Sequence, residues 1–249
     1  IALFANSPWR HGQRTAMASA RAHVWTDVDN ARCRPGAMAF DPTATVADWA
    51  SWVADVPMYF RKMVGDDGQG RWLDVPRGMT FRQFLERGMN GQRPTLADWE
   101  SHLSTVFPDM RLKRYVEIRG ADCVPVSLMP ALPAFAKGLF YDARSRRAAL
   151  ALLEDGTGGV DREALRAAAC SAGLEGRVGD RHVGEQARAL VALAAEGLAR
   201  LAVEFGPDPV ADAALDRLTA IASGETEPMW RRSDRILTAT PSLLALAAG

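Results

Sequence analysis

Charged side chains alternate with apolar ones in the stretch RLKRYVEIRGAD, which runs from Arg111 to Asp122. Because side chains alternate across a β-strand, the spacing predicts a strand with Lys113, Glu117 and Arg119 on one face and an apolar face packed under helices. A carboxylate on a rigid strand is a suitable oxygen ligand for Mg²⁺, and a guanidinium two residues on lies about 7 Å away. The pair can hold a metal ion and grip a phosphoryl oxygen that the metal bridges.

A structural interpretation of the same residues stays open. Glu117 and Arg119 can form an ion pair on a solvated sheet face, with no ligand involved. Lys113, at the other end of the face, can meet a further phosphate as a point charge. The spacing therefore allows a nucleotide–metal site without establishing it.

A second group of polar residues lies between Asn6 and Gly36. It includes Asn6, Ser7, Arg10, Arg14, Arg21, His23, Asp27, Asp29, Asn30 and Arg32. The group is either a solvated loop or a buried segment, and the nearby Trp25 and the small residues of AMASA favour burial. Buried charges must be paired or bound to a ligand, so this segment is a second candidate for a site.

The stretch DVPMYFRKM offers two candidates for the lining of a small-molecule pocket, Met58 and Tyr59. On pattern alone, a place in the hydrophobic core is the better interpretation of both residues. No serine or cysteine nucleophile motif occurs in the chain, so covalent catalysis by such a side chain is not indicated.

Helices with clear start signals must position these residues. Capping boxes, in which a Thr caps a helix and the residue three positions later reaches back, begin at Thr45, Thr80 and Thr95. The third helix carries an apolar stripe and ends before Pro108. The proline-containing segment after Val124 is expected to be a buried helix. Beyond a Gly-rich connector at residues 154–161, helices are expected at 161–172, 186–203, 208–223 and 231–247.

Composition narrows the class of function. Hydrophobic residues make up 48% of the 249 residues and the formal net charge is zero, which argues against a nucleic-acid partner. No apolar run approaches the roughly 20 residues that span a bilayer, so no membrane partner is expected. Cys33, Cys123 and Cys170 stand far apart. Together with the lack of a signal peptide, they predict a reducing, cytoplasmic location.

Six motifs together resemble one protein family. In chain order they are FANSP, RAHVWTDVDN, DVPMYF, GMTFRQF, PTLADWESHLSTVFPDMRLKRYVEIRGAD and ALPAFAKGLFYD. Their order and spacing, from Leu3 to Asp142, are similar to those of the plant-type glutamate–cysteine ligases, a group with proteobacterial members. The resemblance implies an enzyme that uses ATP and Mg²⁺ in the first step of glutathione biosynthesis. It would join the γ-carboxylate of L-glutamate to the amine of L-cysteine through a γ-glutamyl phosphate.

The resemblance also implies a fold and a division into domains. The expected class is α+β, with residues 1–153 forming the C-terminal half of a glutamine-synthetase-like catalytic domain. Part of a curved antiparallel sheet is expected there, shaped as a funnel with helices packed outside. Residues 154–249 are expected to form an all-helical C-terminal region.

Roles for individual residues follow from the motifs of the family. Glu117 is expected to bind Mg²⁺, and Arg119 is expected to be the catalytic residue that holds the transferring phosphate. Arg21 is expected to hold the glutamate substrate. The remaining candidates are Tyr59 and Met58 for binding near the cysteine moiety, and Lys113 and Asn6 for binding the nucleotide.

The chain also departs from the family pattern. Members are longer, and their upstream half supplies further metal-binding glutamates. We therefore expect this chain to be the C-terminal portion of a ligase, inactive alone and completed by an upstream segment or a companion polypeptide. Two alternatives stay open: a non-catalytic binding or assembly subunit, and a glutamate ligase with a different amine acceptor. The three cysteines do not match the regulatory disulfides of plant members.

Overall fold

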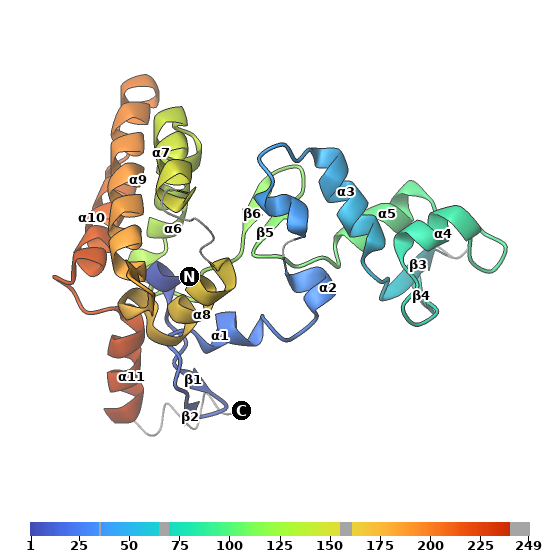
Figure 1. Ribbon diagram of the computed structural model, residues 1–249, viewed down its shortest axis with the longest axis horizontal. Coiled ribbons are helices and arrows are strands. Elements are labelled where there is room, and N and C mark those ends of the chain that lie inside the picture. The colour runs from blue at the N-terminus through green and yellow to red at the C-terminus, as the bar shows by residue number, and fades with distance from the viewer. Residues whose placement is uncertain (35, 65–69, 155–160, 240–249) are drawn as a thin grey trace. The chain divides into compact units, whose positions relative to one another are not determined.

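The computed structural model describes residues 1–34, 36–64, 70–154 and 161–239. The chain divides into two compact units, one made of Ile1–Val24 with Ala121–Gly249 and the other of Trp25–Gly120. Figure 1 shows the helices and strands of both units along the chain. This division groups residues by their contacts, and the predicted extent of a catalytic domain over residues 1–153 stays a prediction.

The first unit is mainly helical. Its α-helices are α1 (Ala20–Val24), α6 (Ala131–Phe140), α7 (Ala143–Glu154), α8 (Arg162–Ala172), α9 (Val183–Phe205), α10 (Pro209–Ser223) and α11 (Met229–Ala239). Short 3₁₀ helices occur at η1 (Ala2–Phe4), η3 (Val126–Leu128) and η4 (Gly173–Glu175). The four helices predicted beyond residue 160 are confirmed within the described residues, and the predicted end of the last one lies outside them.

One feature of the first unit corrects the prediction of an all-helical C-terminal region. Strands β7 (Arg177–Val178) and β8 (Arg181–His182) form an antiparallel hairpin between α8 and α9. Gly179 in its turn has a φ of 57°, a conformation that glycine adopts without steric cost. Strands of two residues are too short to leave a period-two pattern. A second small hairpin pairs β1 (Trp9–Arg10) with β2 (Gln13–Arg14).

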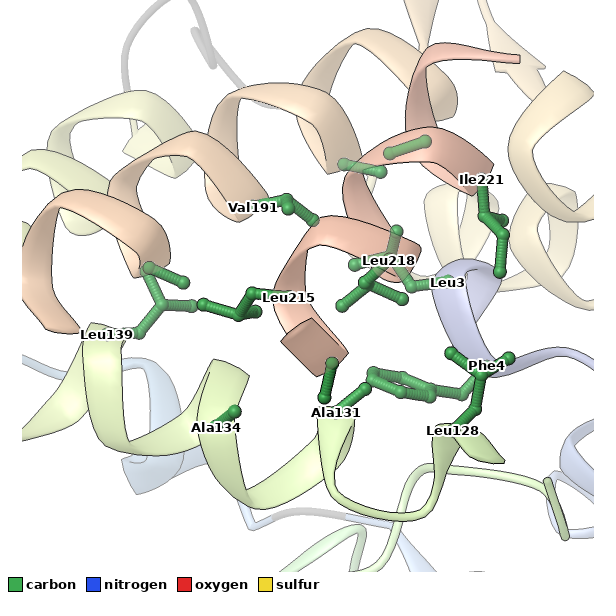
Figure 2. Close-up of a cluster of buried hydrophobic side chains, with 14 of the residues drawn as sticks. Leu3, Phe4, Leu128, Ala131, Ala134, Leu139, Val191, Leu215, Leu218 and Ile221 are labelled. Carbon is green, nitrogen blue, oxygen red and sulfur yellow. The ribbon is translucent and has the colours of Figure 1, made fainter. Parts of the chain in front are cut away.

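The core of the first unit lies between α6, α9 and α10, with η1 against it, as Figure 2 shows. Helix α9 contributes Ala187, Val191, Ala194 and Leu198, all buried and spaced three or four residues apart. That spacing places them on one side of the helix, so the core depends on a single apolar stripe.

Two glycines let α6 and α9 approach closely. A Cβ atom added at Gly138 would overlap the Ala194 carbonyl oxygen, and one added at Gly197 would overlap the Gly138 carbonyl oxygen. The Ser145 hydroxyl of α7 donates to the Leu193 carbonyl of α9 at 2.6 Å. The three helices are therefore joined through backbone contacts as well as through apolar side chains.

The second unit mixes short helices with hairpins. Its helices are α2 (Asn30–Cys33), η2 (Ala37–Phe40), α3 (Val46–Asp55), α4 (Phe81–Arg87) and α5 (Leu96–Leu103). Its strands are β3 (Phe60–Val64), β4 (Gly70–Asp74), β5 (Met110–Leu112) and β6 (Val116–Ile118). Capping boxes begin α3, α4 and α5 at Thr45, Thr80 and Thr95, as the sequence predicts.

The strands of the described residues form four separate two-stranded antiparallel sheets. Helices and antiparallel strands occur together in one chain, so the predicted α+β class is confirmed. The curved, glutamine-synthetase-like sheet stays a prediction. No helix within the described residues has the length and apolar composition that crossing a bilayer requires.

Candidate active site

The stretch that suggested a single strand is a hairpin. Strands β5 and β6 pair antiparallel, with Arg111 opposite Glu117 and Leu112 opposite Val116. Residues 113–115 form the bend, which the Lys113 N–H closes by donating to the Tyr115 carbonyl at 2.8 Å. A period-two pattern is the same in one strand and in two, which explains the error. Val116 is 55% exposed, so the predicted helix cover over this apolar position is also wrong.

Glu117 is held by arginines from both sides. Arg111 Nη2 lies 2.6 Å from Glu117 Oε2, and Arg119 Nη1 lies 3.4 Å from Oε1. Burial alone would raise the pKa of Glu117, but the hydrogen bond from Arg111 and the charges of Arg111, Arg119 and Lys113 outweigh it and lower the pKa. Glu117 is therefore ionised at neutral pH, and it shares a side with Arg119 as the sequence predicts.

Arg119 is only partly satisfied. Its backbone N–H donates to the Asp109 carbonyl at 2.7 Å, and its guanidinium carbon lies 5.5 Å from the centre of the Phe107 ring. Its Nε is buried and has no hydrogen-bond partner among the described residues. An unpaired buried donor costs free energy, so this nitrogen is a candidate for binding an acceptor from a ligand.

The fit of a magnesium ion to these residues is poor. Across residues 1–34, 36–64, 70–154 and 161–239, no group of three or more His, Cys, Asp or Glu side chains is placed to hold a metal ion. Both carboxylate oxygens of Glu117 are already in contact with guanidinium groups. The described residues therefore do not form a Mg²⁺ site by themselves, and metal binding by Glu117 stays a prediction.

Lys113 lies on the exposed bend of the hairpin. It lines a cavity of about 600 Å³ together with Arg114, Trp49 and Trp99. Two cations and two indole rings suit an anion attached to a planar aromatic group. The role of Lys113 in nucleotide binding stays a prediction, and the cavity is the place to test it.

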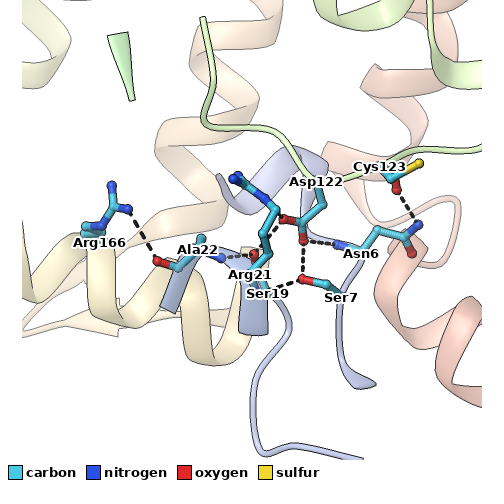
Figure 3. Close-up of polar contacts among 8 residues, drawn as sticks. All are labelled: Asn6, Ser7, Ser19, Arg21, Ala22, Asp122, Cys123 and Arg166. Atoms are coloured by element: carbon cyan, nitrogen blue, oxygen red, sulfur yellow. Dashed lines mark hydrogen bonds and ion pairs between the residues drawn. The ribbon is translucent and has the colours of Figure 1, made fainter. Parts of the chain in front are cut away.

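The second cluster, in the first unit, is built around Asp122, whose side chain is 2% exposed. Figure 3 shows the carboxylate surrounded by donors from distant parts of the sequence. Asp122 Oδ2 accepts from the Asn6 backbone N–H at 2.7 Å and from the Ser7 hydroxyl at 2.8 Å. Oδ1 accepts from the Ser19 hydroxyl at 2.9 Å and from Arg21 Nε at 2.8 Å.

Arg21, at the start of α1, has spare donor capacity. Its side chain is 35% exposed overall, yet Nη2 is buried and has no partner among the residues that the structure describes. Its backbone N–H donates to the Ser7 hydroxyl at 3.1 Å. The chain thus fixes one edge of the guanidinium and leaves a donor on another edge unused.

Asn6, the other predicted nucleotide-binding residue, makes hydrogen bonds within the first unit through both polar atoms of its side chain. Its side-chain NH₂ donates to the Cys123 carbonyl at 2.8 Å, and its side-chain oxygen accepts from the Ser233 hydroxyl of α11 at 2.6 Å. Helix α11 is held further by Asp234, which accepts from Trp9 Nε1 at 3.0 Å. These bonds give Asn6 a structural role, and nucleotide binding by Asn6 stays a prediction.

Tyr59 and Met58 have different surroundings although they are adjacent. Tyr59 is 49% exposed and stacks on the Arg32 guanidinium, whose carbon lies 3.3 Å from the ring centre. The Tyr59 hydroxyl donates to Asp29 at 2.9 Å. Met58 is 7% exposed and belongs to a core cluster with Phe81 and other apolar residues. Tyr59 is thus available to a ligand, and Met58 occupies the core position that the pattern favoured.

Sequence reasoning did not assign a role or a partner to three residues of these clusters. Asp122 and Arg111 stand at the two ends of the stretch that drew attention, but neither was assigned a partner. Arg32 is 2% exposed and contacts Asp29, Thr105 and Pro57 in addition to Tyr59. The available signal was that a buried charged residue needs a partner of opposite charge.

Known proteins with similar sequences include ligases of plants. The chain is 41% identical over 204 residues to "Glutamate--cysteine ligase, chloroplastic" of Nicotiana tabacum, covering 80% of this chain and 37% of that protein. The Arabidopsis thaliana protein of the same name is 41% identical over 202 residues, with 80% and 37% covered. For "Glutamate--cysteine ligase A, chloroplastic" of Oryza sativa subsp. indica the identity is 39%, with 80% and 40% covered. The chain thus spans about two fifths of the length of these relatives.

The names of these relatives correct one prediction. They are chloroplastic proteins, which contradicts the cytoplasmic location expected from the sequence. Cys33, Cys123 and Cys170 form no disulfide with one another in the structure. A sparse set of cysteines suits any reducing compartment, so it does not distinguish the cytoplasm from another one.

A family-level comparison covers a similar part of the chain. The sequence model of glutamate-cysteine ligase family 2 (GCS2) matches residues 1–205, which include both arginine clusters and all helices up to α9. The plant ligases match a similar length of chain at about 40% identity. The chain belongs to glutamate-cysteine ligase family 2.

Proposed function

We propose that this chain forms part of an enzyme that joins L-glutamate, through its γ-carboxylate, to the amine of L-cysteine with ATP. One observation carries the proposal. Within the described residues, three buried side-chain polar atoms lack a hydrogen-bond partner: Arg21 Nη2, Arg119 Nε and Trp230 Nε1. Two of the three belong to the arginines expected from the family motifs to hold glutamate and the transferring phosphate. Unpaired buried donors are expected where a ligand completes the hydrogen bonding.

Arg21 suits the binding of a carboxylate that does not react. A guanidinium presents several donors in a fixed plane, which matches the two oxygens of a carboxylate. Asp122 occupies Nε, and Nη2 is left for the substrate. We assign the α-carboxylate of glutamate to this position, because the γ-carboxylate must be free to react.

The reaction needs activation because a carboxylate is a poor acyl donor. In the proposed sequence, a γ-carboxylate oxygen attacks the γ-phosphorus of ATP, and ADP leaves. The cysteine amine then attacks the γ-carbonyl carbon, loses a proton and displaces phosphate. Arg119 is proposed to stabilise the phosphoryl oxygens, where charge rearranges in the transition state. Binding of Mg²⁺ by Glu117 stays an expectation from the family motifs, because both of its carboxylate oxygens contact guanidinium groups.

The finer aspects of fold and substrate binding are also proposals. A glutamine-synthetase-like funnel is supported by family membership, and hairpins such as β5–β6 can extend by pairing with further strands. The exposed, stacked ring of Tyr59 suits a contact with the cysteine moiety. The cavity beside Lys113 suits the nucleotide.

An acceptor panel tests the proposed function. Purified, catalytically active protein would be supplied with ATP, Mg²⁺ and L-glutamate, and ADP and phosphate release would be followed with different amines. We expect release to require both glutamate and L-cysteine, with γ-glutamylcysteine as the product by mass spectrometry. Faster release with another amine would reassign the acceptor, and no release with any amine would favour a binding or assembly subunit.

A further inference from the structure

Asp122 is the carboxylate at the centre of the Arg21 cluster. It follows Gly120 and Ala121 on the segment that leads from β6 to η3. Its two oxygens accept four hydrogen bonds, from Asn6, Ser7, Ser19 and Arg21. A carboxylate fixed by four donors cannot rotate without breaking several of them, so it is a rigid anchor.

Asp122 holds both the side chain and the backbone of Arg21. Asp122 binds the side chain through Nε, whereas the Ser7 hydroxyl, itself held by Asp122, accepts from the Arg21 backbone N–H at 3.1 Å. Ser19, the other hydroxyl on the carboxylate, accepts from the Ala22 backbone N–H at 3.2 Å. The same network therefore holds both the first turn of α1 and the guanidinium that projects from it (Figure 3).

We propose that Asp122 is a positioning residue, which orients the Arg21 guanidinium so that Nη2 faces a carboxylate of an acidic amino-acid substrate. The inference rests on the proposed role of Arg21 in binding glutamate. An arginine side chain has several rotatable bonds, and a ligand that must first order them binds more weakly. Asp122 orders the side chain before the substrate arrives, without touching the substrate itself.

A purely structural role makes different predictions. Asp122 also ties together segments of the first unit that are distant in sequence, so its loss lowers stability in either case. A structural role alone would not single out one substrate. Positioning through Arg21 must appear in the KM for glutamate, with little change in the KM for cysteine or ATP.

The test compares two aspartates of the same unit in catalytically active protein. Asp122→Asn keeps the shape but replaces one acceptor oxygen with a donor. Asp142→Asn is the matched control, because Asp142 also contacts an arginine, Arg200, at 3.0 Å, at the start of α7. We expect Asp122→Asn to raise the glutamate KM about tenfold, with kcat within about twofold of wild type. Asp142→Asn should leave the glutamate KM unchanged.

A double-mutant cycle with Arg21→Ala separates positioning from other effects. If Asp122 acts through Arg21, then adding Asp122→Asn to Arg21→Ala should not raise the glutamate KM further. An additive effect, or equal KM changes for Asp122→Asn and Asp142→Asn, would overturn the inference alone. An unchanged glutamate KM in Arg21→Ala would instead overturn the proposed role of Arg21, and the inference with it.

A milder variant covers the case in which Asp122→Asn does not fold. Ser7→Ala removes one donor to Asp122 and the acceptor for the Arg21 backbone N–H. We expect a rise of about threefold in the glutamate KM, roughly the effect of one neutral hydrogen bond. The rise should be lost in the Arg21→Ala background. No rise in the otherwise wild-type protein would overturn the inference.

Discussion

Each unit contains an arginine that binds a buried aspartate of its own. The two arginines differ in how many of their nitrogens have partners. In the second unit, Arg61 is 7% exposed and binds Asp98 through Nε at 2.8 Å and through Nη2 at 3.2 Å. Its third nitrogen donates to Gln92 at 2.5 Å. In the first unit, Arg21 is 35% exposed, gives one nitrogen to Asp122 and leaves Nη2 without a partner among the described residues.

The difference separates an ion pair that builds the fold from one that prepares a site. All three guanidinium nitrogens of Arg61 have partners within the protein, so Arg61 is expected to matter mainly for stability. A guanidinium held by one edge keeps its other donors for a ligand. Arg119 resembles Arg21 in this respect, since its Nε is also unpartnered within the described residues.

The largest expected effect is on stability, from Asp98→Asn. Removing one member of a buried ion pair leaves Arg61 uncompensated, so we expect the free energy of unfolding to fall by about 3 kcal/mol or more at pH 7. Urea denaturation measures this change. Asp48→Asn is the matched control, because Asp48 closes the same kind of capping box on α3 but is exposed. An equal loss of unfolding free energy in the two variants would show that the buried Arg61–Asp98 pair contributes no more to stability than an exposed capping box does.

The contribution of Asp98 to the free energy of unfolding should depend on pH. Burial alone would raise the pKa of Asp98, but hydrogen bonds from Arg61 and Thr95 outweigh it and lower the pKa. A depressed pKa contributes stability above the unfolded value of about 3.9, and that contribution is lost as the pH falls through the folded value. The stability difference between wild type and Asp98→Asn should therefore narrow below about pH 4.

The next largest effect is expected from Arg119→Lys, on the rate of the reaction. Lysine keeps the charge but loses the planar donor set, so the phosphoryl group loses a contact that strengthens in the transition state. We expect kcat to fall about a hundredfold, or ~3 kcal/mol, with a small change in the glutamate KM. Arg87→Lys, at an exposed arginine of α4 in the same unit, is the control. A change in KM only would make Arg119 a structural partner of Glu117.

Arg21→Lys should act on binding instead. The substrate carboxylate at this position is the same in the ground state and the transition state, so losing part of its grip raises KM and leaves kcat nearly unchanged. We expect the glutamate KM to rise about tenfold in steady-state assays at saturating ATP and cysteine. A fall in kcat with an unchanged glutamate KM would show that Arg21 stabilises the transition state, the role that is proposed for Arg119.

The smallest effect is expected from Tyr59→Phe. The variant keeps the ring on Arg32 and loses only the hydrogen bond to Asp29 and any polar contact to a ligand. We expect the KM for cysteine to rise about threefold, with the KM for glutamate unchanged. Tyr115→Phe, at an exposed tyrosine of the β5–β6 bend, is the control. An equal change in the cysteine KM of both variants would show that Tyr59 does not contact cysteine.

Local features of the fold could be predicted, and their long-range partners could not. The capping boxes at Thr45, Thr80 and Thr95 involve residues three apart, so the sequence alone is sufficient to place the starts of three helices. The hairpin at β5–β6 has the sequence pattern of one strand, because its three bend residues preserve the alternation of the strands. Glu117 and Arg119 still share a side, since alternation within one strand is local.

In the candidate site, too, the residues that local motifs specify could be predicted, and their long-range partners could not. The motifs identified Arg21 and Arg119, both of which have an unpartnered buried nitrogen in the described part of the chain. Asp122 escaped notice because its partners Ser7 and Arg21 lie more than 100 residues away in the sequence. Nothing local to Asp122 specifies them, since tertiary packing brings the segments together.

The glycine contact between α6 and α9 has a consequence for how the first unit opens. Where two backbones touch at Gly138 and Gly197, neither helix can unwind without exposing the other's carbonyl groups. The amide protons of both helices near this contact should therefore exchange with solvent at a common, slow rate, as one cooperative opening unit. Helix α11 buries only Met229 among its described residues and is otherwise held by polar contacts of Ser233 and Asp234, so its amides should exchange separately and sooner.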